Sequence, residues 1–206
     1  MIPPMSARTF LSRSLLAATL VQFAAATAFG AEPAAEHSAA AHAANGLKRE
    51  WIDGVKPADF LKLGDAPKTV KITLIAAFTE ANHGMNFNGY SHGKAVYSIP
   101  TGWKVEVTFV NPAPVPHSAI VVERPLVKRL QMGDPAFEGA SVPNPAVGIA
   151  LKKSTFTFTA AEAGEYALAC GFPTHAINGH WLALEIRDDL KVPTLKLGDA
   201  EPFPAK

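Results

Sequence analysis

Apolar side chains alternate with polar ones along several short stretches of this chain, and this two-residue period constrains the fold more than any other feature. In the clearest stretch, residues 103–109, Trp, Val, Val and Phe alternate with Lys, Glu and Thr. Successive side chains of a β-strand point to opposite faces, so this stretch is predicted to be a strand with one buried face. Further strands are predicted at residues 70–78, 95–99, 118–123, 155–159, 166–170 and 182–186.

Turn-forming residues separate these predicted strands. Pro, Gly and Asn recur between them, and about seven short strands with frequent turns are typical of a β-sandwich or barrel. One long connection, residues 125–153, breaks the pattern and is predicted to be mostly loop, with a short helix near residues 126–132. Another helical turn is predicted at residues 57–63. The chain is therefore expected to be all-β, with one domain over residues 47–190 and a C-terminal tail over residues 191–206.

The first residues have the pattern of a Sec-type signal peptide, residues 1–30. Arg8 and Arg13 precede an apolar run at residues 15–29, and small residues favour cleavage after Gly30. The run is shorter than the roughly 20 residues that a membrane span needs, so we expect no stable membrane insertion after cleavage. The protein is expected to be periplasmic or otherwise exported.

An Ala-rich stretch, residues 31–46, follows the predicted signal and is predicted to be a flexible linker. It contains His37 and His42, which are expected to be solvated. Lys and Arg number 19 in the whole chain against 18 Asp and Glu, and this balance argues against a nucleic-acid binder, which would carry a basic stripe.

The chain has a single cysteine, Cys170, which cannot form an internal disulfide. It is a reactive thiol, a link to another chain, a buried bystander or a metal ligand. His175 follows five residues later and His180 five residues after that, all on one loop between two predicted strands. His117 follows the rigid, Pro-rich run 112–116 and is the natural candidate for a ligand from elsewhere in the chain. One thiolate and two imidazoles form the trigonal ligand set of a blue-copper site, which a weak axial Met usually completes.

Five stretches give the chain a resemblance to a known family. Residues 86–90, 100–105, 116–118, 143–149 and 169–175 resemble those of a sulfocyanin-type cupredoxin, a family related to rusticyanin. The resemblance implies a Greek-key β-sandwich of about seven or eight strands and one copper ion that alternates between Cu(I) and Cu(II). By the same resemblance, His117, Cys170 and His175 are copper ligands, and Ser118 holds the cysteine loop and tunes its sulfur through hydrogen bonds.

The chain departs from this family at His180, where the family usually has the axial Met. Three interpretations stay open: His180 is a fourth ligand, or it lies close to the copper without binding, or it is turned away. As a ligand, it would weaken the copper–thiolate bond, lower the reduction potential and shift the colour from blue toward green or red. Because histidine titrates near neutral pH, protonation of His180 is expected to give a bluer form at low pH.

The favoured function is single-electron carriage by a monomeric protein that docks briefly with protein redox partners, rather than enzymatic catalysis. The alternatives are a site that binds small ligands or catalyses redox chemistry at an open coordination position, and a copper storage or delivery protein. Two further groups of residues leave alternatives open. Phe172, Pro173, Ile177 and Pro114 form either an apolar docking rim around His175 or ordinary loop packing, and His83, Met85 and His92 form either a second copper site or, as we favour, a polar loop.

Overall fold

The computed structural model describes residues 46–206. The predicted signal peptide and almost all of the predicted linker, including His37 and His42, lie outside the described residues. Ten β-strands and four short 3-10 helices make up the described part. The helices are η1 (Arg49–Trp51), η2 (Pro57–Asp59), η3 (Ala81–Gly84) and η4 (Arg124–Lys128). The strands are β1 (Leu61–Leu63), β2 (Thr69–Ile75), β3 (Ala95–Pro100), β4 (Lys104–Asn111), β5 (Ile120–Glu123), β6 (Lys152–Thr159), β7 (Gly164–Ala169), β8 (Trp181–Arg187), β9 (Thr194–Leu197) and β10 (Phe203–Pro204).

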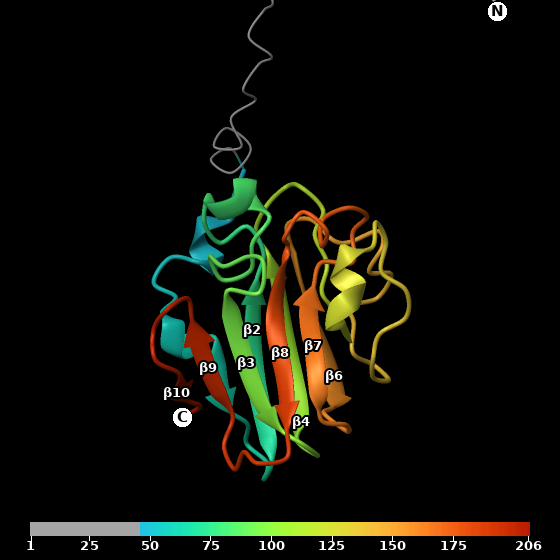
Figure 1. Ribbon diagram of the computed structural model, residues 1–206. Helices are drawn as coiled ribbons and strands as arrows, with labels where there is room; N and C mark the ends of the chain where they lie inside the picture. Colours follow the sequence, from blue (N-terminus) through green and yellow to red (C-terminus); the bar gives the residue numbers. More distant parts are fainter. Residues whose placement is uncertain (1–45) are drawn as a thin grey trace, which may run out of the picture. The chain divides into compact units, whose positions relative to one another are not determined.

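The strands form two sheets that pack face to face (Figure 1). One sheet has the order β1-β2-β4-β6 and the other has the order β10-β9-β3-β8-β7-β5. The pairs β2–β4 and β3–β8 are parallel, and the other pairs are antiparallel. The predicted all-β sandwich is confirmed, with three more strands than the seven that the alternation indicated.

The main core lies between the two sheets, and the alternation in sequence explains it. Along β4, Val105, Val107 and Phe109 are buried, whereas Lys104 and Thr108 are exposed. The burial of apolar surface at roughly 25 cal/mol per Å² is what stabilises such a sandwich. The two-residue period therefore explains why one face of a strand such as β4 lies in the core and the other does not.

The long connection between β5 and β6 covers the outer face of the larger sheet. It begins with η4, one turn of 3-10 helix in the region where a short helix was predicted. A second apolar cluster lies beneath it, and Val127 and Met132 pack there against Ile120 and Val122 of β5. The connection is therefore a packed layer rather than a free loop.

The segment predicted as a C-terminal tail, residues 191–206, is part of the larger sheet. β9 pairs with β3 through Leu195 and Leu197, and β10 pairs with β9. Leu195 is fully buried and Ala205 nearly so. The prediction of a tail differs from the structure because the Pro residues at 193, 202 and 204 resemble linker composition, whereas the short segment between them has one buried face. Proline is tolerated in strands at the edge of a sheet, where β10 lies.

Over residues 46–206 no helix is both long enough and apolar enough to cross a membrane.

Several loops gather at one end of the sandwich, the upper end in Figure 1, where the loop between β7 and β8 and the helix η3 both lie.

Candidate metal centre

Four side chains from two segments of the chain meet at this end of the sandwich. Cys170 directly follows β7, His180 directly precedes β8, and His175 lies in the loop between them. His117 comes from the connection between β4 and β5. Their candidate ligand atoms all lie within 4.8 Å of one another, and this is the group of His, Cys, Asp or Glu side chains in the described residues that could hold a metal ion.

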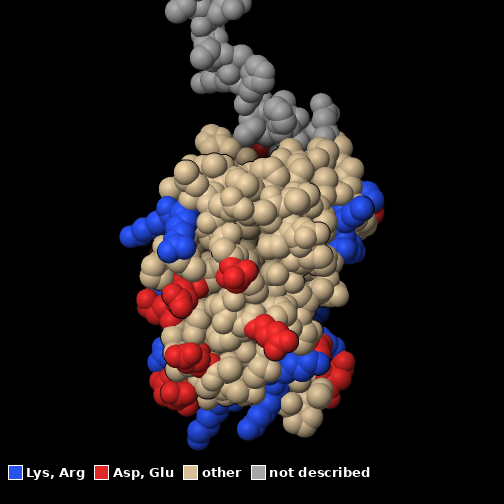
Figure 2. Space-filling model, turned by 90° about the vertical axis from the view of Figure 1, so that its right-hand side faces the viewer, with Lys and Arg blue, Asp and Glu red and all other residues tan. Residues whose placement is uncertain are grey.

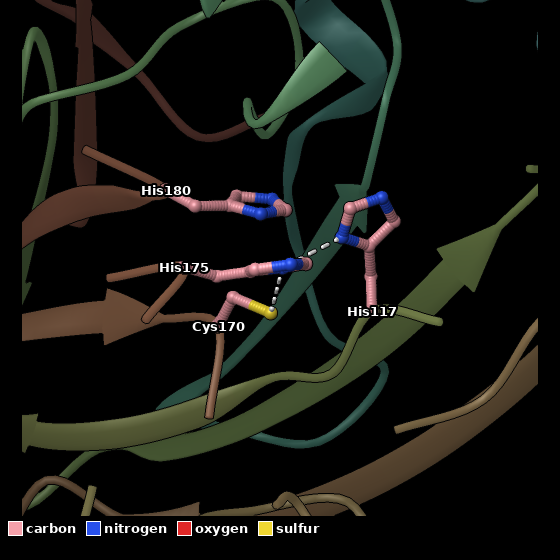
Figure 3. A group of neighbouring side chains, drawn as sticks. All are labelled: His117, Cys170, His175 and His180. Atoms are coloured by element: carbon pink, nitrogen blue, oxygen red, sulfur yellow. Dashed lines mark hydrogen bonds between the residues drawn. The ribbon is translucent and has the colours of Figure 1, made fainter. Parts of the chain in front are cut away.

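The ligand atoms face a common point (Figure 3). Nδ1 of His117 lies 3.3 Å from Nδ1 of His175, and the sulfur of Cys170 lies 3.5 Å from the same His175 atom. The ring centroid of His180 lies 4.8 Å from that of His117 and 5.8 Å from that of His175. Spacings of this size suit donors that share one ion with bonds of about 2.0–2.3 Å.

His180 is the strongest sign that the site is built to hold a cation. The residue is completely buried, and neither of its ring nitrogens has a hydrogen-bond partner. A buried polar group without a partner costs roughly 1–3 kcal/mol. A metal ion within the cluster would satisfy one of these nitrogens. A ligand atom of His180 lies within 4.8 Å of those of the other three side chains, so the interpretation in which it is turned away is wrong.

Local backbone pairing fixes His117. Its N–H donates to the carbonyl of Ile149 at 3.1 Å, and the N–H of Ile149 donates back to His117 at 2.8 Å. This short bridge ties the His117 segment to the long connection. Gly148 makes it possible, because its φ is +71° and a Cβ there would lie 2.8 Å from the His117 carbonyl oxygen.

The loop that carries the other three residues closes on itself. The N–H of Cys170 donates to the carbonyl of His180 at 2.9 Å, and the N–H of His180 donates to the carbonyl of His175 at 3.0 Å. These bonds hold the two ends of the loop together where β7 and β8 begin to pair. The close spacing of the three side chains therefore follows from the hairpin itself.

Ser118 connects the two halves of the site. Its N–H donates to the sulfur of Cys170 at 3.3 Å, and its hydroxyl lies 3.8 Å from the same sulfur. The N–H of Gly171 donates to the Ser118 hydroxyl at 2.8 Å. The predicted role of Ser118, to hold the cysteine loop and hydrogen-bond the sulfur, is confirmed.

Burial sets the protonation of the cluster. Burial, with a smaller effect of the neighbouring His175, lowers the pKa of His117 to about 3. Burial also lowers the pKa of His175, and burial with the nearby His117 and His175 holds the pKa of His180 well below its usual range. Burial raises the pKa of the Cys170 thiol to about 11, against the hydrogen bonds from Ser118. Without metal, the imidazoles are neutral donors at pH 7, and an incoming ion must displace the thiol proton.

The residues of the possible second copper site lie outside this cluster. His83 and His92 are exposed and Met85 is half-buried. Asn86 and Asn88, nearby, bond main-chain groups of the turn and of β2. The Asn88 side chain accepts from the N–H of Ile75 at 2.8 Å, and the Asn86 side chain donates to the Ala81 carbonyl at 2.7 Å.

Sequence reasoning missed the partner of the His180 ring. The buried Phe87 ring packs against it with centroids 4.1 Å apart and the planes tilted by 43°. Phe87 lies between Asn86 and Asn88, whose buried side chains fix the turn. Its place inside the Asn86–Tyr90 stretch marked it as part of the resemblance but gave no sign of which residue it contacts.

The chain is similar to several known proteins. Residues 57–133 match the model of the sulfocyanin (SoxE) domain. Sulfocyanin from Sulfolobus acidocaldarius is 30% identical over 134 residues, which are 61% of this chain and 67% of that protein. Among solved structures, rusticyanin from Thiobacillus ferrooxidans covers 63% of this chain and 89% of its own length, with 18% identity and a TM-score of 0.37. Auracyanin A, a "blue" copper protein from Chloroflexus aurantiacus, covers 58% and 99%, with 17% identity and a TM-score of 0.41.

An all-β sandwich with a Cys and three His at one end defines a cupredoxin, a protein whose cofactor is one copper ion. More narrowly, the chain belongs to the sulfocyanin family. The donor set fits this cofactor, because a soft thiolate with imidazoles suits copper in both oxidation states.

Proposed function

We propose that this protein carries single electrons on one copper ion held by His117, Cys170 and His175, with His180 as the fourth ligand. Copper would supply the redox step by alternating between Cu(I) and Cu(II). The protein's own part is to keep the four donors in place. Because they are fixed by paired strands and a self-closed loop, little must rearrange when the charge changes, and electron exchange is fast for that reason.

The burial of the site is the observation that favours a carrier over a site that binds small ligands. Cys170 and His180 are completely buried, and His117 is 4% exposed. The fourth position is filled from inside by His180, with Phe87 behind it. A small molecule therefore finds no open approach on that side. The same enclosure argues against a delivery protein, which must release its copper readily.

His175 is the route by which electrons would enter and leave. It is the one member of the cluster that is only half-buried, and Phe172 packs on its ring at 4.7 Å between centroids. Apolar side chains are exposed around this end: Leu130 is 67% exposed, Val147 is 68% exposed and Ile177 is 45% exposed. The Thr174 N–H donates to the Leu130 carbonyl, which places Leu130 beside the copper loop.

Charge is sparse over the same end of the molecule. On the face shown in Figure 2, Lys, Arg, Asp and Glu gather over the lower half and the flanks, and the upper central part is almost entirely tan. A small apolar surface without charge suits brief docking to a protein redox partner. Such docking, by an exported monomer released from its signal peptide, is the mode of action that we propose.

The test is spectroscopic titration of the copper-loaded protein with azide and nitric oxide, beside measurement of electron self-exchange between oxidised and reduced copies. We expect unchanged absorption and EPR spectra on addition of either ligand, and fast self-exchange. The matched control is His180→Gly, which opens the fourth position and should respond to azide. A wild-type spectrum that changes with azide as the control does would favour a ligand-binding site instead.

A further inference from the structure

A second segment of the chain, residues 81–93, packs against the main chain on both sides of His180. This segment contains η3 and ends just before β3, and Figure 1 shows η3 at the same end of the sandwich as the β7–β8 loop. It contributes no residue to the metal cluster. Its contacts are instead with the backbone that carries the fourth imidazole.

Three hydrogen bonds from this segment end on carbonyls that flank His180. The side-chain amide of Asn82 donates to Asn178 at 2.8 Å, and the N–H of His92 donates to Gly179 at 2.7 Å. The N–H of Gly93 donates to Trp181 at 3.0 Å. The carbonyl of His180 itself is occupied from the other side by Cys170. The main chain is thus held at four consecutive residues, 178–181.

The His92 ring closes the space next to Gly179. Gly179 is buried although it lies on an exposed loop, and a Cβ at this position would overlap the His92 ring. Gly179 also has a φ of +91°, which favours glycine. Only glycine therefore lets the His92 ring cover the residue that precedes His180.

The segment is itself rigid enough to act as a support. Asn82 also donates to the Met85 carbonyl at 2.8 Å, and Asn86 bonds the main chain of Thr79, Ala81 and Gly89. The same turn places Phe87 against the His180 ring. One segment therefore holds His180 both at its backbone and at the face of its ring.

We propose that residues 81–93 are a positioning clamp for His180, in which the Asn82 side-chain amide and the His92 ring fix the backbone around it so that its imidazole faces the other three ligands. The inference rests on the proposed coordination of copper by His180. Without the clamp, the 178–181 backbone relaxes outward into the space that the His92 ring fills, and His180 loses its hold on the copper. Asn82 and His92 are positioning residues and touch no metal.

The experiment compares His92→Gly and Asn82→Gly with the control His83→Gly. Asn82, His83 and His92 each have a φ between +51° and +55°, so glycine keeps the backbone conformation in each case. His83 is exposed, and none of the contacts above involves its ring. The readouts are the copper(II) EPR and absorption spectra, the reduction potential, and amide hydrogen exchange of residues 178–181 in the metal-free protein.

We expect His92→Gly and Asn82→Gly to shift the spectra and the potential toward those of His180→Ala, and to speed exchange at residues 178–181 by roughly tenfold. His83→Gly should match the wild type. Gly179→Ala should also shift the spectra, and less so when combined with His92→Gly, because the overlapping ring is then gone.

Two results overturn the clamp and point to different causes. If His180→Ala changes the copper spectra but His92→Gly and Asn82→Gly leave spectra, potential and exchange at their wild-type values, the clamp alone is wrong. If His180→Ala also leaves the spectra unchanged, His180 does not bind copper, and both the clamp and that part of the proposed site are wrong.

Discussion

The main-chain N–H of Ser118 points at the sulfur of Cys170, 3.3 Å away, while the Ser118 hydroxyl accepts from the main chain directly after that cysteine. One residue therefore both tunes the thiolate and ties the two ligand-bearing segments together. A hydrogen bond to a metal-bound sulfur withdraws electron density from it. The sulfur is then a weaker donor to Cu(II) than an unbonded thiolate.

Ser118→Ala tests this double role. Removal of the hydroxyl leaves the buried N–H of Gly171 without its acceptor, so we expect a loss of roughly 1–3 kcal/mol in the free energy of unfolding. The main-chain N–H still donates to the sulfur, but the hydroxyl that lies 3.8 Å from the sulfur is lost. The potential should therefore fall, because the sulfur donates more strongly to Cu(II). Urea unfolding and voltammetry measure the two effects. The control is Ser154→Ala in β6, in the other sheet. If Ser118→Ala had the same free energy of unfolding and the same reduction potential as this control, the double role of Ser118 would be excluded.

His180→Met restores the residue that this family usually has at the fourth position. Imidazole is a stronger and harder donor than a thioether, so its replacement should strengthen the copper–thiolate bond and favour Cu(I). We expect a bluer absorption spectrum, a narrower copper hyperfine splitting in EPR and a higher potential. The control is His83→Met, an exposed histidine outside the cluster. Identical spectra for wild type and His180→Met would remove His180 from the coordination sphere.

The sequence was informative where a side chain repeats with a structural period or where spacing is local. The alternation at residues 103–109 predicted β4, and the five-residue spacings predicted that Cys170, His175 and His180 share one loop. Both signals are local, since strand pleat and hairpin length determine them. The short strands β9 and β10 gave no such signal, because they have only four and two residues and lie among the prolines at 193, 202 and 204.

The contacts of residues 81–93 could not be predicted from the sequence, for a different reason. Asn82 and Asn178 are 96 residues apart, and the bond between them ends on a main-chain carbonyl, which every residue has. The identity of the side chain at residue 178 therefore gives no information about that contact. Gly179 was the one hint in the sequence, because a glycine just before His180 suggests that another group packs closely against the main chain there. The sequence does not identify that group as the His92 ring.

The metal-free protein should lose stability as the pH falls from about 6.5 toward 3. Burial lowers the folded-state pKa of His117 to about 3, and burial also lowers those of His175 and His180. In this range the unfolded chain binds protons that the folded chain does not, so protonation favours unfolding. Each such histidine contributes a slope of roughly 1.4 kcal/mol per pH unit. Urea unfolding at pH 7, 6, 5 and 4 measures it.

A matched variant identifies the source of that slope. His117→Asn should reduce it by about one proton, whereas His83→Asn, at an exposed site outside the cluster, should leave it unchanged. An equal slope in all three proteins would show that other groups cause the acid lability. In the copper-loaded protein, His175 is the one ligand that is only half-buried, whereas His180 is completely buried. Changes of the copper spectra in acid should therefore begin at His175, and the bluer low-pH form through His180 stays a prediction.

The apolar surface near His175 should control how fast the protein exchanges electrons without affecting the copper itself. Val147 and Ile177 are exposed by 68% and 45%, and neither is a ligand. Lysine at either position puts a charge where two copies, or a carrier and its partner, must exclude water. We expect Val147→Lys and Ile177→Lys to slow electron self-exchange roughly tenfold, equivalent to about 1.4 kcal/mol, with unchanged absorption, EPR and potential. The control is Leu63→Lys in β1, where a leucine that is 42% exposed lies in the other sheet. NMR line broadening in mixtures of oxidised and reduced protein measures the rate, and equal slowing by all three substitutions would mean that net charge, not this surface, limits the encounter.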